Sequence, residues 1–453
     1  MDDYKRDIKM AETVAQLVSE QNGRAYYVGG YVRDRLLCRE NKDIDIEVHG
    51  LSPEKLENIL DRLGERIAIG ESFGIYSIKG YSLDIAMPRK EELRGTGHKD
   101  FDIFVDPCIG TCKAAKRRDF TINAMMQDVL TGEIIDHFGG EADLKAGIVR
   151  HVSDDSFSED ALRVLRAAQF AARFEFEVAD ETKELCRRMD LSSLAGERVM
   201  AELEKALIKA KKPSIFFETL REMDQLGTWF PELEAIIGLE QDPVHHPEGD
   251  VWNHTMTVLD AAARYREAVK YPFAFMLAAL THDFGKAVCT QVVNGRIHAY
   301  RHETEGIPVA EKFLKRISSE RKLADYALNL VKNHMRPFIA AEQNAAVKST
   351  NRMFDESVDP VALICLSSAD NCVKDKVAAD AKVNFLYERL RVYEEYMSRP
   401  YVMGKDLLDA GLEPGEYFSE LLGYAHKLRL AGVEKQNALK QTLAYAQKMD
   451  KHF

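Results

Sequence analysis

The chain has 453 residues, of which 45% are hydrophobic and 30% are charged, and its formal net charge is -12. This length predicts several domains, and the acidic balance argues against a protein that coats nucleic acid over its whole surface. The longest apolar run, residues 273–280, is too short to span a membrane, and the charged N-terminal stretch lacks the apolar core of a signal peptide. The seven scattered cysteines favour reduced thiols in a cytoplasmic protein.

Strand-like and helical segments alternate in the first third of the chain. Strands are predicted for segments that are short, β-branched or aromatic and bounded by turn residues: 25–29, 42–50, 75–80, 81–87 and 132–138. After Asp136 strand signals become scarce. Residues 158–174 carry apolar side chains at helical spacing, with Ser158 as the expected N-cap. The pattern predicts an α+β fold, in which a head with a mixed β-sheet precedes an elongated all-α region.

Acidic residues alternate with apolar ones in the predicted strand 42–50. Asp43, Asp45 and Glu47 would share one face, because successive strand side chains point to opposite faces. Two carboxylates placed two residues apart can bind the same divalent ions, as metal-assisted phosphoryl transfer requires. An ordinary amphipathic strand with a solvated face would show the same alternation.

Gly29 and Gly30 follow the first predicted strand and precede a short predicted helix. Glycine lets the backbone approach a phosphate closely, and a helix N-terminus offers unpaired N–H groups. Asp84, in segment 81–87, is a candidate third carboxylate from a neighbouring strand, although an exposed strand residue would look the same.

Four motifs occur in a fixed order: GGYVRD at 29–34, DID at 43–45, RRDFTINAM at 117–125 and EDALR at 159–163. Together they resemble the class II tRNA nucleotidyltransferases, which comprise CCA-adding enzymes and related bacterial poly(A) polymerases. The resemblance covers roughly residues 26–210. It implies that Asp43 and Asp45 carry Mg2+, with Asp84 as a further candidate catalytic residue. It also implies a nucleotide site formed by Gly29, Gly30, Arg33, Arg117, Arg118, Asp119, Asp160, Arg163 and Arg166.

The last two motifs have implied roles that their chemistry supports. Residues 117–119 would hold the ribose and phosphates of the nucleotide, since arginine matches phosphate by its fork geometry; a basic patch at a helix cap is the alternative. Asp160 and Arg163, three residues apart on the predicted helix, would read the base by its Watson–Crick edge. An ordinary surface ion pair is the alternative there. The polar segment 87–116 resembles the flexible loop of the family, or is a plain long connection.

A second group of candidate ligands lies between residues 245 and 370. It resembles the HD phosphohydrolase domain, with six implied ligands for a divalent metal such as Mg2+, Mn2+, Ni2+ or Co2+: His254, His282, Asp283, His302, His334 and Asp370. Lys286 could balance the charge of a phosphate. His245 and His246 could be ligands or loop residues, and the sequence does not separate these alternatives.

The predicted organisation is a nucleotidyltransferase head at 1–137, a helical neck and body at 138–240 that binds the base and RNA, an HD domain at 241–375, and a helical tail at 376–453 that contacts tRNA. The predicted function is addition of CMP and AMP from CTP and ATP to the 3′ end of tRNA, with an attached phosphohydrolase. An enzyme adding only A, including a poly(A) polymerase, is the nearest alternative. A catalytically silent RNA-binding protein is a distant one. No membrane partner is expected, and the oligomeric state is left open.

Overall fold

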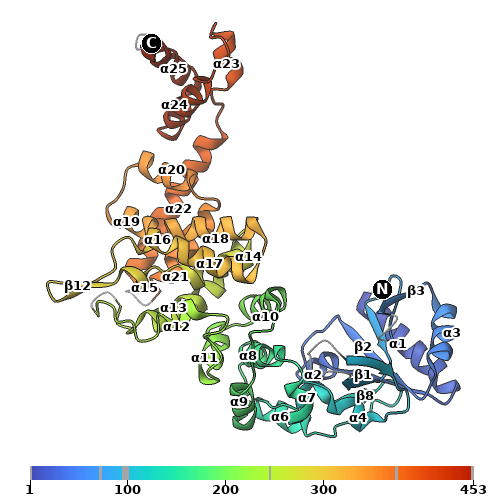
Figure 1. The fold of residues 1–453 in the computed structure, drawn as a ribbon. Coiled ribbons are helices and arrows are strands. Elements are labelled where there is room, and N and C mark those ends of the chain that lie inside the picture. The colour runs from blue at the N-terminus through green and yellow to red at the C-terminus, as the bar shows by residue number, and fades with distance from the viewer. Residues whose placement is uncertain (1–2, 71–73, 94–100, 244–245, 373–375, 450–453) are drawn as a thin grey trace. The chain divides into compact units, whose positions relative to one another are not determined.

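The computed structural model describes residues 3–70, 74–93, 101–243, 246–372 and 376–449 (Figure 1). The chain divides into two compact units. The first comprises Met1–Ala206 and Ile215–Trp229, and the second comprises Leu207–Ser214 and Phe230–Phe453.

A mixed β-sheet forms the centre of the head. In the described residues its strand order is β3-β4-β5-β2-β1-β8-β9, and β2 pairs in parallel with β5 while the other neighbouring strands pair antiparallel. This confirms the predicted mixed sheet, and each of the five predicted segments contributes a strand. The strands are β1 (Arg24–Val28), β2 (Ile44–His49), β3 (Arg66–Gly70), β4 (Ile75–Ile78), β5 (Leu83–Ala86), β8 (Met126–Asp128) and β9 (Ile134–Ile135).

Helices α1 and α3 pack against each other and against the sheet (Figure 1). The buried residues of α1 include Ala11, Val14, Ala15 and Val18, whose spacing of three and four gives one apolar face. The helices from the head to the end of the body are α1 (Asp3–Glu20), α2 (Gly30–Leu36), α3 (Pro53–Leu63), α4 (Thr111–Lys116), α5 (Thr121–Ala124), α6 (Gly140–Ala146), α7 (Asp154–Ser158), α8 (Leu162–Phe174), α9 (Asp180–Arg187), α10 (Gly196–Lys209) and α11 (Ser214–Glu222). A short parallel ladder joins β10 (Ile148–Val149) to β11 (Glu177–Val178).

The segment 87–116 is not a plain connection. Strands β6 (Arg89–Leu93) and β7 (Phe101–Val105) form an antiparallel hairpin, and α4 follows it. Residues 94–100, within the same predicted loop, lie outside the described residues. Alternating apolar residues in "FDIFV" favour a strand, but the charged and glycine-containing surroundings hid this pattern in the sequence.

The helix predicted from Ser158 begins later than expected. The hydroxyl of Ser153 caps α7 by accepting from the backbone N–H of Ser156, whereas Ser158 donates to the carbonyl of Asp154. Asp160 then accepts from the backbone N–H of Leu162 at 3.1 Å, where α8 begins. The prediction that Ser158 is the N-cap is therefore wrong, because a turn interrupts the helical pattern.

The second unit is helical apart from one hairpin in its described residues. Helix α14 is buried on every side and contacts α13, α18 and α21, as its uniformly apolar sequence requires. The helices around it are α12 (Pro231–Glu234), α13 (Val251–Ala262), η2 (Ala263–Ala268), α14 (Pro272–Thr281), α15 (Lys286–Cys289), α16 (His302–Glu305), α17 (Ile307–Ile317), α18 (Arg321–Asn333), α19 (Arg336–Glu342), α20 (Val347–Asp355) and α21 (Pro360–Asp370). The hairpin pairs β12 (Gln291–Val293) with β13 (Arg296–His298).

The C-terminal helices form a small core of their own. Leu407, Leu421, Ala425 and Ala438 are buried together there, and α22 and α20 contact α24. The helices of this core are α23 (Gly404–Asp409), α24 (Phe418–Leu430) and α25 (Lys435–Met449), and α22 (Lys376–Ser398) precedes them. Among the described helices, none combines the length and the apolar character needed to cross a lipid bilayer.

Candidate active sites

Three carboxylates meet on the sheet of the head. Asp45 lies in β2 and is the register partner of Asp84 in β5, so the two side chains share one face of neighbouring strands. Asp43 lies two residues before Asp45 and is exposed just ahead of β2. The structure therefore brings together the three residues that the sequence pattern nominated.

The crowding of these carboxylates disfavours their charged forms. Burial raises the pKa of Asp45 to about 6, with further contributions from the charges of Asp84 and Asp43 and an opposing one from Arg118. Burial and the charge of Asp43 likewise raise the pKa of Asp84. A cluster of hard oxygen donors with mutual repulsion fits Mg2+, whose charge would offset that repulsion.

The turn at Gly29 brings backbone against this cluster. Gly29 has a φ of 66°, which disfavours other residues, and a Cβ at this position would lie 3.2 Å from Nη1 of Arg118 and 4.0 Å from Oδ2 of Asp45. Helix α2 begins at the next residue, Gly30. The two glycines therefore place a helix N-terminus next to the candidate metal ligands.

Arg33 does not lie on an open surface. It is 3% exposed, pairs with Asp34 at 2.7 Å and donates to Oδ1 of Asn123 at 2.5 Å. Its guanidinium also lies over the rings of Phe170 and Phe174. The implied nucleotide contact of Arg33 is not supported by this placement, which instead makes Arg33 an internal support of the turn.

Glu47 anchors the two arginines of the third motif. It is 1% exposed, and its Oε2 lies 3.5 Å from Nη2 of Arg117 and 3.4 Å from Nη2 of Arg118, while Oε1 lies 2.9 Å from Nε2 of His49. Burial would raise the pKa of Glu47, but the hydrogen bond with His49 and the charge of Arg118 outweigh it and lower the pKa to about 2. The alternative of an ordinary strand with a solvated face is therefore wrong at Glu47.

Asp119 is engaged within the protein. One oxygen accepts from the backbone of Phe120 at 2.8 Å and from the amide of Asn123 at 3.0 Å, and the other accepts from Nε of Arg166 at 2.8 Å. Arg166 also lies 3.7 Å from the buried Glu202. Burial opposes ionisation of Asp119, but the neighbouring Arg166 and the hydrogen bonds lower its pKa. Asp119 thus fixes Arg166 in place.

Asp160 and Arg163 lie close in sequence but have different partners. Asp160 pairs with Arg198 at 2.8 Å, whereas Arg163 donates to the main-chain carbonyls of Ser156 and Arg117, the latter at 2.9 Å. The surface ion pair between Asp160 and Arg163 that was the alternative to base reading is not formed. Because Asp160 precedes α8, the expected shared helix face is also wrong. Arg198, on α10, had no signal that linked it to Asp160 in the sequence.

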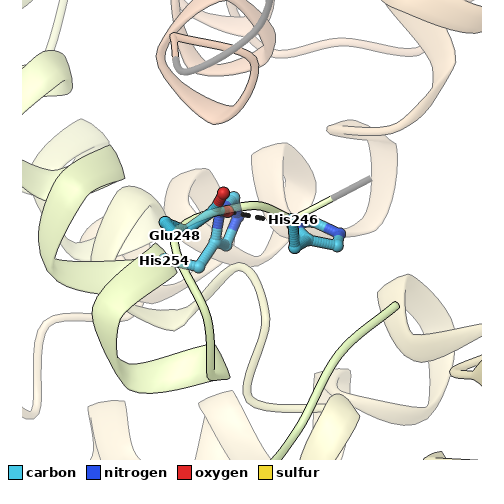
Figure 2. A group of neighbouring side chains, drawn as sticks. All are labelled: His246, Glu248 and His254. Carbon is cyan, nitrogen blue, oxygen red and sulfur yellow. Dashed lines mark hydrogen bonds and ion pairs between the residues drawn. The ribbon is translucent and has the colours of Figure 1, made fainter. Parts of the chain in front are cut away.

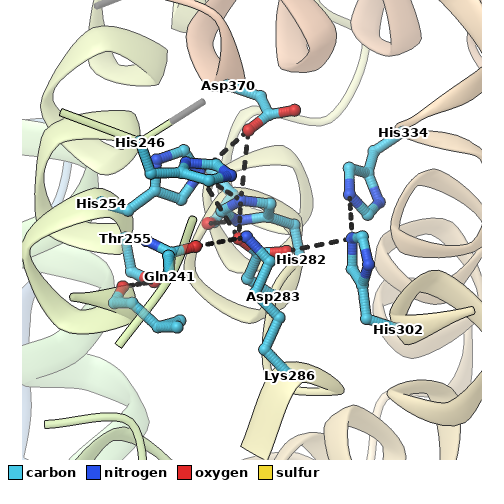
Figure 3. A network of polar contacts seen from close by, with 12 residues as sticks. Gln241, His246, His254, Thr255, His282, Asp283, Lys286, His302, His334 and Asp370 are labelled. Atoms are coloured by element: carbon cyan, nitrogen blue, oxygen red, sulfur yellow. Dashed lines mark hydrogen bonds and ion pairs between the residues drawn. The ribbon is translucent and has the colours of Figure 1, made fainter. Parts of the chain in front are cut away.

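The six implied HD ligands converge in the second unit (Figure 3). They come from α13, the turn after α14, α16, the end of α18 and the end of α21. One triad comprises His254, His282 and Asp370, and another comprises Asp283, His302 and His334. Asp283 joins the triads, since Oδ2 lies 3.2 Å from Nε2 of His282 and Oδ1 lies 3.2 Å from Nε2 of His302.

The imidazoles of this cluster are arranged as metal ligands. Nδ1 of His282, His302 and His334 bonds the main-chain carbonyl three residues earlier, at 2.8, 2.9 and 2.7 Å. Those bonds place a proton on Nδ1, so Nε2 is the ring nitrogen that could bind a metal. Two pairs of Nε2 atoms nevertheless approach to 3.3 Å, His254 with His282 and His302 with His334. Converging Nε2 atoms and a carboxylate that contacts both triads are groups that could hold divalent cations.

Glu248 contacts Nδ1 of His254, whereas Nε2 of the same ring faces Asp370. Figure 2 shows Glu248 with His254 and His246. Oε1 of Glu248 accepts from Nδ1 of His254 at 2.6 Å and lies 3.0 Å from Nδ1 of His246. Burial and the charges of Lys286 and His254 lower the pKa of His246 to about 4, so His246 is neutral. These three residues could also hold a metal among themselves. Glu248 was missed in the sequence, and His245 lies outside the described residues.

Lys286 is tied to the cluster. Its Nζ lies 2.7 Å from Oδ2 of Asp283 and donates to Oε1 of Gln241 at 2.6 Å. Burial disfavours the charged form of Asp283, but His282 and Lys286 hold its pKa well below the usual range. The structure gives Lys286 a carboxylate partner rather than an open position for phosphate.

Gly285 permits the close packing of α15 on α16. A Cβ at this position would overlap the carbonyl oxygen of His302 and would lie 2.7 Å from the backbone nitrogen of Gly306. The absence of a side chain therefore lets Asp283 and His302 approach each other. A cavity of about 390 Å3 lies over this cluster, with Asp283, His302 and Asp370 among its lining residues.

Three family models match the chain. The poly A polymerase head domain matches residues 25–150, the probable RNA and SrmB-binding site of polymerase A matches 175–237, and the HD domain matches 251–375. Both the nucleotidyltransferase and HD classes depend on metals, and the residue groups described above could hold them.

Curated relatives extend this likeness over most of the chain. The multifunctional CCA protein of Halorhodospira halophila is 38% identical over 324 residues, covering 70% of this chain and 75% of the relative. That of Alkalilimnicola ehrlichii is 34% identical over 395 residues, covering 84% and 92%. The chain belongs to the family of multifunctional CCA proteins, which confirms the predicted class of a nucleotidyltransferase with an attached HD domain.

Solved structures share the fold. The Thermotoga maritima CCA-adding enzyme complexed with tRNA matches with a TM-score of 0.63 at 22% identity, covering 97% of this chain and 95% of that one. A CCA-adding enzyme in complex with ATP matches with a TM-score of 0.66 at 22% identity, covering 97% and 94%.

Proposed function

We propose that the head transfers CMP and AMP from CTP and ATP to the 3′ end of tRNA and releases pyrophosphate. The observation that carries this proposal is the cluster of Asp43, Asp45 and Asp84 beside the Gly29 turn and Arg118. Membership of the multifunctional CCA family supports the choice of substrate. We place the protein in the cytoplasm, a choice supported by its seven free cysteines.

The residues of the head have separable tasks in this reaction. Asp43 and Asp45, with Asp84, would hold Mg2+, which supplies charge neutralisation for the triphosphate and the attacking hydroxyl. Arg117 and Arg118 would bind phosphate oxygens while the carboxylate of Glu47 holds the two guanidiniums beside each other. The tRNA hydroxyl forms a bond to the α-phosphorus, the bond to pyrophosphate breaks, and the hydroxyl proton leaves to solvent.

The test is addition to tRNA that lacks its 3′ end, with each labelled nucleotide supplied alone and in combination. Incorporation of C and then A supports the proposal, whereas incorporation of A alone identifies an A-adding enzyme or poly(A) polymerase. Asp43→Ala or Asp45→Ala is expected to abolish addition of every nucleotide in single turnover at saturating Mg2+. Near-normal rates in either variant would remove the metal assignment, and no addition by the wild type would favour a silent RNA-binding protein.

We propose that the HD unit hydrolyses phosphate esters at RNA ends, with 2′,3′-cyclic phosphate as the first substrate to test. The convergence of His254, His282, Asp283, His302, His334 and Asp370 carries this second function. These residues would hold Mg2+, Mn2+, Ni2+ or Co2+, which would activate water for attack on phosphorus. One P–O bond of the cyclic ester breaks as water adds, leaving a free hydroxyl and a phosphomonoester. Its test is given below with the two activities separated.

A further inference from the structure

The cavity over the HD cluster, hereafter the HD cavity, is larger than a phosphate group needs. Its volume of about 390 Å3 lies within the range of roughly 300–1,000 Å3 that is usual for small-molecule sites. The metal-ligand cluster supplies part of the lining. Other parts of the lining come from hairpin β12–β13, from α19 and the residue before it, and from α22. These walls have no role in the hydrolysis described so far.

Part of the lining is apolar and open. Ile297 on β13, Met335 and Ile339 line the HD cavity. Ile339 is 43% exposed, and Ile297 and Met335 are partly exposed. Apolar side chains in a cavity that is also lined by polar ligands provide a surface for a flat, weakly polar group such as a nucleobase.

Two cations that do not belong to the ligand set line the same cavity. Arg296 is exposed on β13, and Lys382 projects from α22. Nζ of Lys382 lies 3.8 Å from a carboxylate oxygen of Glu342, whose side chain is 71% exposed, so this pair is weak and exchangeable. Unlike Lys286, neither cation is bound to Asp283 in the structure.

We propose that the HD cavity binds a nucleotide that carries two phosphates, as the terminal nucleotide of an RNA does. The proposal rests on the proposed hydrolase and names its substrate class. The 3′ or 2′,3′-cyclic phosphate lies at the metal-ligand cluster, and the phosphate 5′ to the same ribose is bound by Arg296 and Lys382. The base packs on Ile297, Met335 and Ile339. Simple phosphomonoesters reach the cluster but use none of these contacts.

The test compares adenosine 3′,5′-bisphosphate with adenosine 3′-phosphate as inhibitors of cyclic-phosphate hydrolysis. In the wild type the 5′-phosphate strengthens inhibition about tenfold, the effect of one charge-assisted hydrogen bond. The double variant Arg296→Ala, Lys382→Ala loses this difference but hydrolyses p-nitrophenyl phosphate within about twofold of the wild type, because it keeps the ligand cluster. A matched control, Lys315→Ala with Arg321→Ala, removes the same charge from positions that are 70% and 93% exposed and outside the cavity lining.

Calorimetric titration of Ni2+-loaded protein with adenosine 3′,5′-bisphosphate gives a readout that does not need turnover. Nucleotide binding by the head is common to all variants. Binding heat that is lost in the double variant but kept in the control therefore comes from the HD cavity. Ile297→Asp should weaken adenosine 3′-phosphate and leave inorganic phosphate unchanged. Equal titrations in all proteins overturn the proposal, as does a parallel loss of p-nitrophenyl phosphate hydrolysis. Absence of any hydrolysis by the wild type would refute the proposed hydrolase activity. The titration would still show whether the HD cavity binds the nucleotide.

Discussion

At the scale of single residues, the buried carboxylate of Glu47 keeps two guanidiniums together in the head. Arg117 and Arg118 both lie within 3.5 Å of its Oε2, and a neutral side chain there would remove the buried negative charge that both guanidiniums contact. Glu47→Gln is therefore expected to lower the free energy of unfolding by about 1–3 kcal/mol and to raise KM for ATP and CTP. Urea unfolding of the variant and steady-state kinetics measure the two effects.

A control for this change is Glu65→Gln, since Glu65 is 67% exposed and pairs with Lys79 at the surface. Its effect on stability should stay within about 0.5 kcal/mol. If Glu47→Gln matched this control in both stability and KM, the anchoring role would have to be abandoned.

Substitution of Asp84 is expected to raise the stability of the metal-free protein and to lower its activity. In the absence of divalent metal, Asp84→Asn removes one charge from a cluster that repels itself, so the metal-free variant should melt at a higher temperature than the wild type, by roughly 2–4 °C for each 1 kcal/mol of relieved repulsion. The variant should also gain less stability from Mg2+ and lose nucleotide addition. Thermal melts with and without Mg2+ measure this. An equal Mg2+ response in the two proteins would show that Asp84 is not part of the metal site.

At the scale of secondary-structure elements, Arg163 joins α7 to the end of α4 through the carbonyls of Ser156 and Arg117. Arg163 therefore helps to position the main chain at Arg117, beside Arg118. A good contact with a base is worth about 1–3 kcal/mol of discrimination between nucleotides. We expect Arg163→Ala to lose about one to two decades of preference for CTP and ATP over UTP and GTP, measured by competition between labelled nucleotides. A uniform rise in KM without loss of selectivity would assign Arg163 to phosphate binding or structure.

Elements were predictable where their pattern is local. The alternation in β2 and β5 identified both strands, and the parallel register then placed Asp45 beside Asp84. Strand β8 has three residues and exists through its pairing with β1 and β9, which no local pattern shows. The break before α8 was hidden because apolar spacing continues across it, while the N-cap depends on which hydroxyl finds a partner.

In the candidate sites, too, residues with a local sequence signal could be predicted and residues with distant partners could not. The HD ligands could be predicted from histidine and aspartate residues such as His282 and Asp283. These residue types are uncommon next to an apolar run such as residues 273–280. Glu248, Gln241 and Arg198 are ordinary residues whose partners are distant in sequence or set by a turn. Their contacts follow from the folded chain alone, as does the burial of Arg33 and Asp119.

At the scale of the whole molecule, the candidate sites for the two proposed activities lie in separate compact units. The double variant His282→Ala, Asp283→Ala should therefore abolish metal-dependent hydrolysis of a cyclic phosphate and still add nucleotides to tRNA with a free 3′ hydroxyl. Parallel assays of both reactions, with Mg2+, Mn2+, Ni2+ or Co2+ in the hydrolysis, measure this. Calorimetric melting serves as the folding control. Loss of addition in a variant whose first unit melts normally would show that the units are functionally coupled.

Gly285 influences the metal-ligand cluster of the second unit although it is not itself a ligand. Gly285 has no side-chain atom that could bind a metal. Because it lacks a side chain, α15 can approach α16 closely, and this approach sets the distance between Asp283 and His302. Gly285→Ala would retain every metal-binding group and still force them apart. We therefore expect a homologue that keeps all six ligands but carries a side chain at this position to lack the hydrolase activity.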